Sequence, residues 1–186
     1  MSVKYVIQAR ENSQRFHGKC FVKINEKWII QYIIDACKKS KHYKTGSIHF
    51  VIPTNDLQLR DLASGYKIYT STDDNCLQGY LAIGDNHDII VRLTADSPLI
   101  ETSEIDKNID KVIEGYEYAS NEITTFGNAC EAFTKEALVK YCDISTDKVH
   151  VTPSIRNYSN RWIPSLMVDY PESIKTIEEY INDETM

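Results

Sequence analysis

Short apolar runs alternate with amphipathic segments along almost the whole chain, and this alternation limits the fold more than any other feature. The runs are rich in β-branched and aromatic residues, as in KYVIQ and DIIVRLTA, and are too short to be ordinary helices. Strands that alternate with helices favour a mainly parallel sheet covered by helices on both faces. The sequence therefore predicts one three-layer α/β/α domain over residues 1–186.

The expected elements follow from the apolar periodicity. We expect strands at residues 4–8, 47–53, 66–70, 88–95, 116–120 and 162–168, with residues 121–134 irregular or extended. We expect helices at residues 28–38, 57–63, 75–84, 135–142, 150–157 and 171–181, and a further helix that begins at Ser103. Ser103 and Asp106 have the spacing of a capping box at the start of that helix.

The charge and the cysteine content argue against several classes of protein. The formal net charge is −6, with 21 Lys and Arg against 27 Asp and Glu, whereas a nucleic-acid or membrane binder needs a broad basic face. The five cysteines are odd in number and contain no C-x-x-C pair, which argues against a disulfide framework or a structural zinc site. We therefore expect a cytoplasmic protein without a nucleic-acid or membrane partner.

Three loops are the places where such a sheet would bind a ligand, because ligands lie beyond the carboxyl ends of parallel strands. They are residues 9–20, 70–75 and 94–101. The first loop contains three cations, Arg10, Arg15 and Lys19, together with Gly18, whose backbone could approach a phosphate closely. It matches neither a Walker A motif nor a G-x-G-x-x-G loop. The alternative is a solvated surface loop with scattered charges.

Two carboxylates follow apolar runs and are candidate magnesium ligands. Asp96 comes directly after the strand at 88–95, and Asp169 ends the run LMV. Mg²⁺ takes one or two protein carboxylates and shares substrate phosphates, so this pair suits it. Each aspartate also has a structural interpretation, since Asp96 could bond its own turn and Asp169 could sit at a helix N-terminus.

Several motifs in order resemble one known family. QARENSQRFHGK (8–19) resembles the pattern Q-A-R-x-x-S-x-R-x-x-G-K, and RLTADSPLI (92–100) resembles R-[IL]-T-[GA]-D-x-P-L-I. The segments YASN, EAFTKEAL, HVTPSIRN and VDYPESI follow in the same order. Together they are similar to the cytidylyltransferase-like nucleotidyltransferases of the GT-A type, in the branch of spore coat polysaccharide biosynthesis protein F, and to CMP-KDO and CMP-sialic acid synthetases.

The resemblance implies a reaction and a role for each matching residue. It implies transfer of CMP from CTP to a sugar or sugar acid, with release of pyrophosphate, by a Mg²⁺-dependent enzyme of the nucleotide-diphospho-sugar transferase fold that forms a homodimer. The implied nucleotide-binding residues are Gln8, Ala9, Arg10, Ser13, Arg15, Lys19 and Thr94. Lys19, Arg15 and Asp96 would be catalytic, and Asp96 and Asp169 would bind the metal. Asn121, Glu131 and His150 would contact the acceptor.

The chain also departs from the family pattern, which leaves two other readings open. Thr70 and Gly79 stand where the family has arginines, Ala129 replaces an aspartate, and Val149 replaces a glutamate. A GT-A glycosyltransferase that uses a nucleotide-sugar is one alternative, although such enzymes usually carry a D-x-D pair and this chain has none. A degenerate nucleotide-binding protein without an acceptor site is the other.

Overall fold

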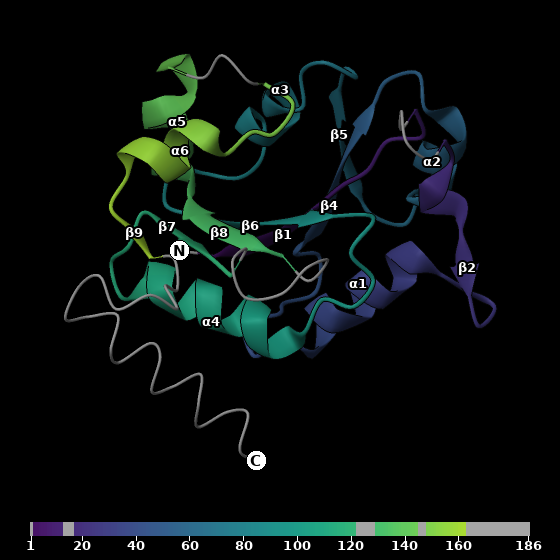
Figure 1. Cartoon of the computed structure of the whole chain (residues 1–186), viewed down its shortest axis with the longest axis horizontal. Helices are drawn as coiled ribbons and strands as arrows, with labels where there is room; N and C mark the ends of the chain where they lie inside the picture. Colours follow the sequence, from purple (N-terminus) through teal and green to yellow (C-terminus); the bar gives the residue numbers. More distant parts are fainter. Residues whose placement is uncertain (1, 13–16, 122–128, 145–147, 163–186) are drawn as a thin grey trace.

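A computed structural model describes residues 2–12, 17–121, 129–144 and 148–162. Within these residues, seven strands form one sheet, in the spatial order β5-β4-β1-β6-β8-β7-β9 (Figure 1). Their bounds are β1 Val3–Gln8, β4 Ile48–Pro53, β5 Lys67–Ser71, β6 Ile89–Thr94, β7 Tyr118–Ser120, β8 Glu131–Thr134 and β9 Arg161–Trp162. The helices are α1 Ile29–Lys39, α2 Leu57–Leu62, α3 Leu77–Leu81, α4 Thr102–Ile113, α5 Lys135–Tyr141 and α6 Pro153–Tyr158, with 3₁₀ turns at η1 Lys19–Phe21 and η2 Cys142–Ile144.

The sheet is mainly parallel, as the sequence predicts. Strands β5, β4, β1 and β6 are all parallel neighbours, while β8 runs antiparallel to both β6 and β7. The chain moves outward from β1 through β4 to β5 and then returns to place β6 on the other side of β1. The strand order reverses there, which makes the carboxyl ends of β1 and β6 the expected crevice for a ligand.

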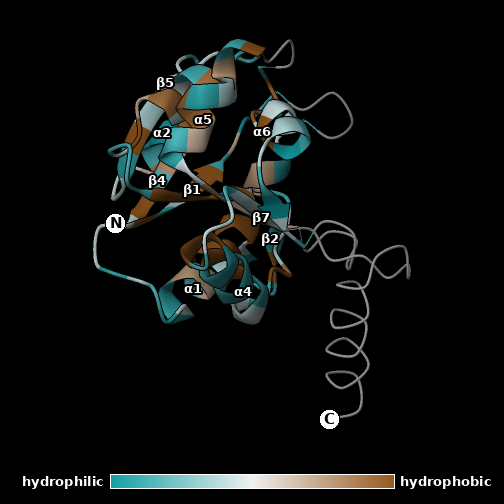
Figure 2. Ribbon diagram, turned by 90° about the vertical axis from the view of Figure 1, so that its left-hand side faces the viewer, coloured by the Kyte–Doolittle hydropathy of each residue, from teal (hydrophilic) through white to brown (hydrophobic). Residues whose placement is uncertain are grey.

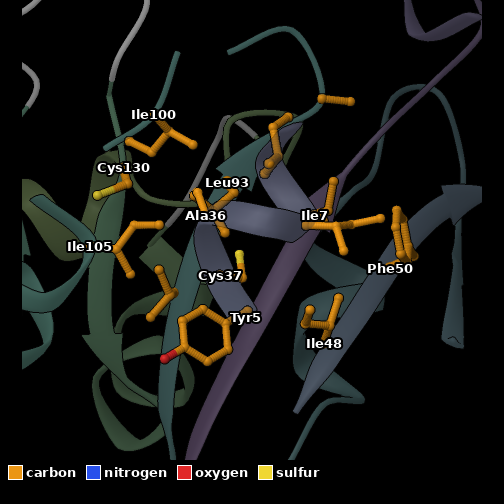
Figure 3. Packing of buried hydrophobic residues seen from close by; sticks show 14 of the residues in the cluster. Tyr5, Ile7, Ala36, Cys37, Ile48, Phe50, Leu93, Ile100, Ile105 and Cys130 are labelled. Carbon is orange, nitrogen blue, oxygen red and sulfur yellow. The ribbon is translucent and has the colours of Figure 1, made fainter. Parts of the chain in front are cut away.

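Helices cover both faces, so the three-layer prediction is confirmed. On one face, α1 and α4 bury residues such as Cys37 and Ile105 against Tyr5 and Phe50 of the sheet (Figure 3). On the other face, α3, α5 and α6 pack on a second apolar cluster that includes Tyr80 and Phe133. Figure 2 shows β1 and β4 as a largely hydrophobic layer between α1 and α4 on one side and α5 and α6 on the other.

A small hairpin precedes α1 and was not predicted. Strands β2 (Lys23–Ile24) and β3 (Lys27–Trp28) pair antiparallel around Asn25 and Glu26, which both have positive φ. Two left-handed residues form the tight turn whose twist suits a hairpin. The connection from β1 to α1 therefore consists of the first loop followed by this hairpin.

The predicted capping box at Ser103 is wrong. Helix α4 begins at Thr102, its N-cap is Glu101, and no side chain caps its first turn. The carboxylate of Asp106 instead accepts hydrogen bonds from the hydroxyl of Ser40 and from the backbone N–H of Lys41, at the end of α1. The side chain of Asp106, which the local pattern predicts as part of a helix cap, therefore forms a tertiary contact instead.

The other expected elements agree within a few residues where they are described. The strand expected at 116–120 is β7, which begins only at Tyr118, and part of 121–134 forms β8. The helix expected at 150–157 begins only at Pro153. The strand expected at 162–168 is described only as far as Trp162, and the helix expected at 171–181 lies outside the described residues. All five cysteines are free. No helix in the described ranges is long and apolar enough to cross a membrane.

Candidate active site

The three loops selected from the sequence meet beyond the ends of β1 and β6. Arg10, just after β1, donates from Nη1 to the carbonyl oxygen of Asp73 in the loop after β5, at 3.2 Å. Lys19, from the first loop, forms an ion pair with Asp96 in the loop after β6. The predicted convergence of these loops at one edge of the sheet is therefore confirmed.

Gly18 sets the path of the first loop. Its φ of +70° lies in the left-handed region that glycine adopts without strain. Its N–H donates to the carbonyl of Glu11 at 3.0 Å, and its own carbonyl accepts from Phe21 at 2.9 Å, which closes the turn into η1. Lys19, the first residue of η1, is thereby directed to the cleft; Ser13 and Arg15 lie outside the described residues.

A hollow of about 230 Å³ opens between these loops. Every described residue of the predicted nucleotide-binding set lines it, together with Asp96 and His150. These residues are Gln8, Ala9, Arg10, Lys19 and Thr94. Three cations, Arg10, Lys19 and Arg92, and one carboxylate thus share a small polar space at the carboxyl edge, which suits a phosphorylated ligand.

Asp96 is held in this hollow as an ionised carboxylate. Burial opposes its charge, but hydrogen bonds from Lys19 and Thr94 hold the pKa of Asp96 below its ordinary value. A hard oxygen ligand at a strand end is what Mg²⁺ prefers. Among the described residues, no cluster of three or more His, Cys, Asp or Glu side chains could hold a metal by itself. Asp96 therefore fits a metal that takes its remaining ligands from phosphate and water; Asp169 lies outside the described residues.

A second hollow of about 420 Å³ adjoins the first. Arg92, Thr94 and His150 line both, so they form the wall between the two spaces. The rest of its lining comes from β8 and from the start of α6. It consists of Ala129, Glu131, Thr152, Pro153, Arg156 and Asn157. The edge of the sheet therefore offers two connected binding spaces that share one wall.

A buried ion pair between Arg92 and Glu131 supports this wall. The two residues face each other directly across β6 and β8, and Arg92 Nη1 pairs with Glu131 Oε2. The other oxygen of Glu131 accepts from the hydroxyls of Tyr118, at 2.7 Å, and Thr152, at 2.6 Å. Burial opposes the charge of Glu131, but Arg92 and the two hydroxyls keep its pKa below the ordinary value. Glu131 lies at the predicted acceptor site, with both carboxylate oxygens already bonded within the protein.

Asn121 lies beneath the site and lines neither hollow. Its side chain is fully buried, and its Oδ1 accepts from the backbone N–H of Cys130 at 2.8 Å. Asn108 of α4 donates to the carbonyl of Cys130 at 3.1 Å. Two buried amides thus fix the backbone that leads into β8. Of the three predicted acceptor residues, His150 and Glu131 reach the second hollow.

Sequence reasoning missed several residues of the second hollow, among them Arg92, Thr152 and Arg156. Arg92 interrupts the apolar run IIVRLT, and a charge in a buried strand needs a partner. That conflict, together with the position of Arg92 at the start of the motif RLTADSPLI, was the available sign of a role for Arg92. Thr152 and Arg156 lie in the motif HVTPSIRN, but nothing else in the local pattern sets them apart from the surface of a short helix.

The glycine at position 79 has a packing reason. A Cβ added there would lie 2.7 Å from Cγ1 of Val51 and 3.3 Å from the carbonyl oxygen of Thr70. Helix α3 therefore lies directly on β4 and β5 at this point, with no room for a side chain. The arginine that the family pattern has at this position does not fit this arrangement.

A mainly parallel sheet with a cationic loop, a strand-end carboxylate and two adjoining hollows at its carboxyl edge is typical of α/β proteins that bind phosphorylated ligands. Residues 5–180 match the cytidylyltransferase family. The chain belongs to that family, a family of nucleotidyltransferases.

Individual relatives agree with this assignment. A cytidylyltransferase structure from Leptospira borgpetersenii serovar Hardjo-bovis (strain JB197) is 25% identical, with a TM-score of 0.78 over 98% of this chain and 87% of that one. The spore coat polysaccharide biosynthesis protein SpsF of Bacillus subtilis (strain 168) is 22% identical over 169 residues, 84% of this chain and 70% of that protein. The 3-deoxy-manno-octulosonate cytidylyltransferase of Acaryochloris marina (strain MBIC 11017) is 27% identical over 135 residues, 68% of this chain but 52% of that enzyme. The expected nucleotide-sugar-transferase-like fold is confirmed.

Proposed function

We propose that this protein transfers CMP from CTP to a hydroxyl group of a sugar or sugar acid, releases pyrophosphate, and serves the synthesis of a surface polysaccharide. The observation that carries the proposal is the pair of hollows that share Arg92, Thr94 and His150. A transferase needs a donor space and an acceptor space in contact. The family match and the names of the relatives supply the donor, CTP, and the class of acceptor.

The first hollow is the proposed nucleotide site. Arg10 and Lys19 would neutralise the triphosphate, since a guanidinium grips phosphate oxygens with its planar fork and an ammonium acts as a compact charge. Gln8, Ala9 and Thr94 would contact the rest of the nucleotide. The resemblance adds Ser13 and Arg15 to the phosphate contacts. This proposal accounts for a local group of cations in a chain whose net charge is −6.

Asp96, with Asp169 added by the resemblance, would hold Mg²⁺ beside the phosphates. When bound, the metal would supply Lewis-acid neutralisation of charge on the phosphate oxygens. Lys19 forms an ion pair with Asp96 in this structure. Binding of the nucleotide would give Lys19 a phosphate partner and leave the carboxylate of Asp96 available.

The second hollow would hold the acceptor with its hydroxyl against the shared wall. The hydroxyl oxygen attacks the α-phosphorus of CTP, the bond from that phosphorus to the bridging oxygen breaks, and pyrophosphate leaves with the electron pair. The hydroxyl proton passes to solvent or to a nearby base. The protein contributes alignment of the two reactants and electrostatic stabilisation of the developing charge. A cytoplasmic location and a homodimer complete the proposal, and gel filtration with light scattering tests the dimer.

Thermal unfolding with CTP, UTP, GTP and ATP, each with and without Mg²⁺, tests the proposal first. A ligand at a hundred times its dissociation constant adds about 2.7 kcal/mol to the stability of the folded state, which gives a clear shift in Tm. We expect a Mg²⁺-dependent shift with CTP. Pyrophosphate release is then measured with 3-deoxy-manno-octulosonate, its 8-amino-3,8-dideoxy analogue and other sugar acids. If none of the four triphosphates shifts the Tm, the proposed donor is refuted.

A further inference from the structure

Residues 150–152 form a strained turn at the wall between the two hollows. The carbonyl oxygen of His150 accepts from the backbone N–H of Thr152 at 2.6 Å, which closes a three-residue turn. The central residue, Val151, has a φ of +63°. A γ-turn with positive φ is rare and strained, and a β-branched residue adopts such a conformation only where its surroundings force it.

The surroundings hold this turn from several directions. The side chain of Val151 is buried in the apolar cluster under α5 and α6. Before the turn, the carbonyl of Val149 accepts from Gln8 Nε2 at 3.2 Å. After it, Thr152 Oγ1 donates to Glu131 Oε1 at 2.6 Å and also lies 3.2 Å from the carbonyl oxygen of His150. The segment is thus fixed on both sides of His150.

Both attachments end at the same buried ion pair. Arg92 Nε donates to Gln8 Oε1 at 3.1 Å, which fixes the orientation of the amide that holds Val149. Arg92 Nη1 pairs with Glu131, which holds Thr152. In the strand register, Arg92 lies opposite Glu131, and Gln8 lies opposite Thr94, which is two residues after Arg92 on the same face of β6. The side chains of Gln8, Arg92 and Glu131 therefore extend from the same face of the sheet. One polar frame, built on three strands, therefore carries the strained turn.

The strained turn lies where the two hollows meet. His150 is its first residue and lines both hollows. With CTP in the first hollow and the acceptor in the second, the attacking hydroxyl and the α-phosphorus meet beside His150. Strained backbone persists where the fold over-determines it, and it collects at active sites, where it preorganises a group for its task.

We propose that the Val151 turn is a preorganised support that presents His150 to the reacting groups, with Thr152 and the Arg92–Glu131 pair as its positioning residues. The identity of the groups beside His150 rests on the proposed function. The way in which the turn fixes the position of His150 does not depend on that function. The inference assigns Glu131 to the support of the site in place of direct contact with the acceptor. Arg92 and Thr152 receive roles that the sequence did not suggest.

The first test needs no substrate. The ring signals of the five histidines are recorded by ¹H–¹³C NMR, and the signal of His150 is identified by its loss in His150→Gln. Thr152→Val removes the hydroxyl that joins the turn to Glu131 and nearly preserves the shape. We expect the His150 signal to shift and to broaden or split in this variant. Thr152→Ser keeps the hydroxyl and should leave the signal as in the unmodified protein.

Thr102→Val is the matched control, because it also removes one hydroxyl, which donates to the carbonyl of Ala36 at 3.1 Å at the start of α4, away from both hollows. It should leave the His150 signal unchanged. Glu131→Gln breaks the same frame at another point and covers the case in which Thr152→Val does not fold. An unchanged His150 signal in folded Thr152→Val or Glu131→Gln would overturn the inference.

The second test is kinetic, with CTP and 3-deoxy-manno-octulosonate as the probe acceptor. We expect Thr152→Val to lower kcat at least tenfold while the Kd of CTP, measured by calorimetry, changes less than twofold; Thr152→Ser should restore kcat. An equal loss in CTP affinity would indicate a merely structural role and overturn the inference. Absence of pyrophosphate release by the unmodified protein with every acceptor counts against the proposed function, and the NMR result then decides the inference alone.

Discussion

His49 should make the stability of this protein fall steeply in mild acid. The residue lies in β4 and is 5% exposed. Neither ring nitrogen has a hydrogen-bond partner among the described residues. Burial, and then the positive charges of Lys4 and Lys67, lower the pKa of His49 from 6.5 to about 4, while Asp88 acts weakly in the opposite direction. The folded protein therefore keeps a neutral imidazole at a pH where the unfolded chain carries a charged one.

The sign follows from the proton count. Between pH 6.5 and 4 the unfolded state binds a proton that the folded state does not, so the free energy of unfolding decreases as the pH falls. With pKa values of 6.5 unfolded and about 4 folded, the contribution of His49 is about zero at pH 7.5, a loss of about 2 kcal/mol at pH 5, and a loss of about 3 kcal/mol at pH 4.

His49→Phe isolates this effect. Phenylalanine has a ring of similar shape, gives up no hydrogen bond in the described structure, and keeps the packing against Tyr69, whose ring lies 5.8 Å away. Urea unfolding of both proteins at pH 7.5, 6, 5 and 4 gives the free energy of unfolding at each pH. The variant should match or exceed the unmodified protein at pH 7.5 and exceed it by about 2 kcal/mol more at pH 5. His87→Gln, at an exposed position, is the control.

Parallel pH curves for His49→Phe and the unmodified protein would refute this reasoning. They would mean that the buried imidazole gains its proton without cost, through a partner or a water that offsets burial. A difference of the predicted size that also occurs in His87→Gln would assign the effect to overall charge.

Three further predictions concern the packing of α3 and the first hollow. Gly79→Ala should lower stability by about 1–2 kcal/mol in urea unfolding, because overpacking against β4 costs more than the gain in helix propensity; Gly65→Ala, where nothing lies within 4 Å of an added Cβ, should not lower it. Lys19→Ala should weaken binding of CTP at least tenfold more than binding of CMP by calorimetry, and equal losses would contradict a contact with the β- and γ-phosphates. Asp96→Asn should abolish Mg²⁺-dependent pyrophosphate release with an unchanged circular dichroism spectrum, and full turnover would contradict the metal assignment.

The fold and the location of the site were within reach of the sequence because both depend on local patterns. The apolar runs around Val6 and Val91 mark central strands, since only a sheet covered on both faces buries such runs completely. Once the strands are placed, the carboxyl-end rule brings Arg10, Lys19 and Asp96 to one edge without knowledge of any contact. The ion pair between Lys19 and Asp96 is the direct result.

The role of a polar residue could not be predicted from the sequence where it depends on a contact with a distant part of the chain. Asp106 fits a local cap, yet a hydroxyl 66 positions earlier in the chain takes its carboxylate. Asn121 fits a turn or a ligand contact, yet it caps the backbone of Cys130 inside the core. In each case the residue type permits both roles, and the choice depends on which segment folding brings beside it.

The register of β6 and β8 determines whether Glu131 contacts a ligand or stabilises the protein itself. From the sequence, a glutamate in a family motif beside an acceptor site is a natural candidate for contact with a hydroxyl. The antiparallel register of β6 and β8 places it directly opposite Arg92, where neither charge could remain buried without the other. The same register leaves the hydroxyls of Tyr118 and Thr152 to complete its second oxygen. The charge of Glu131 is thus used within the protein, in the support of the wall that the two hollows share.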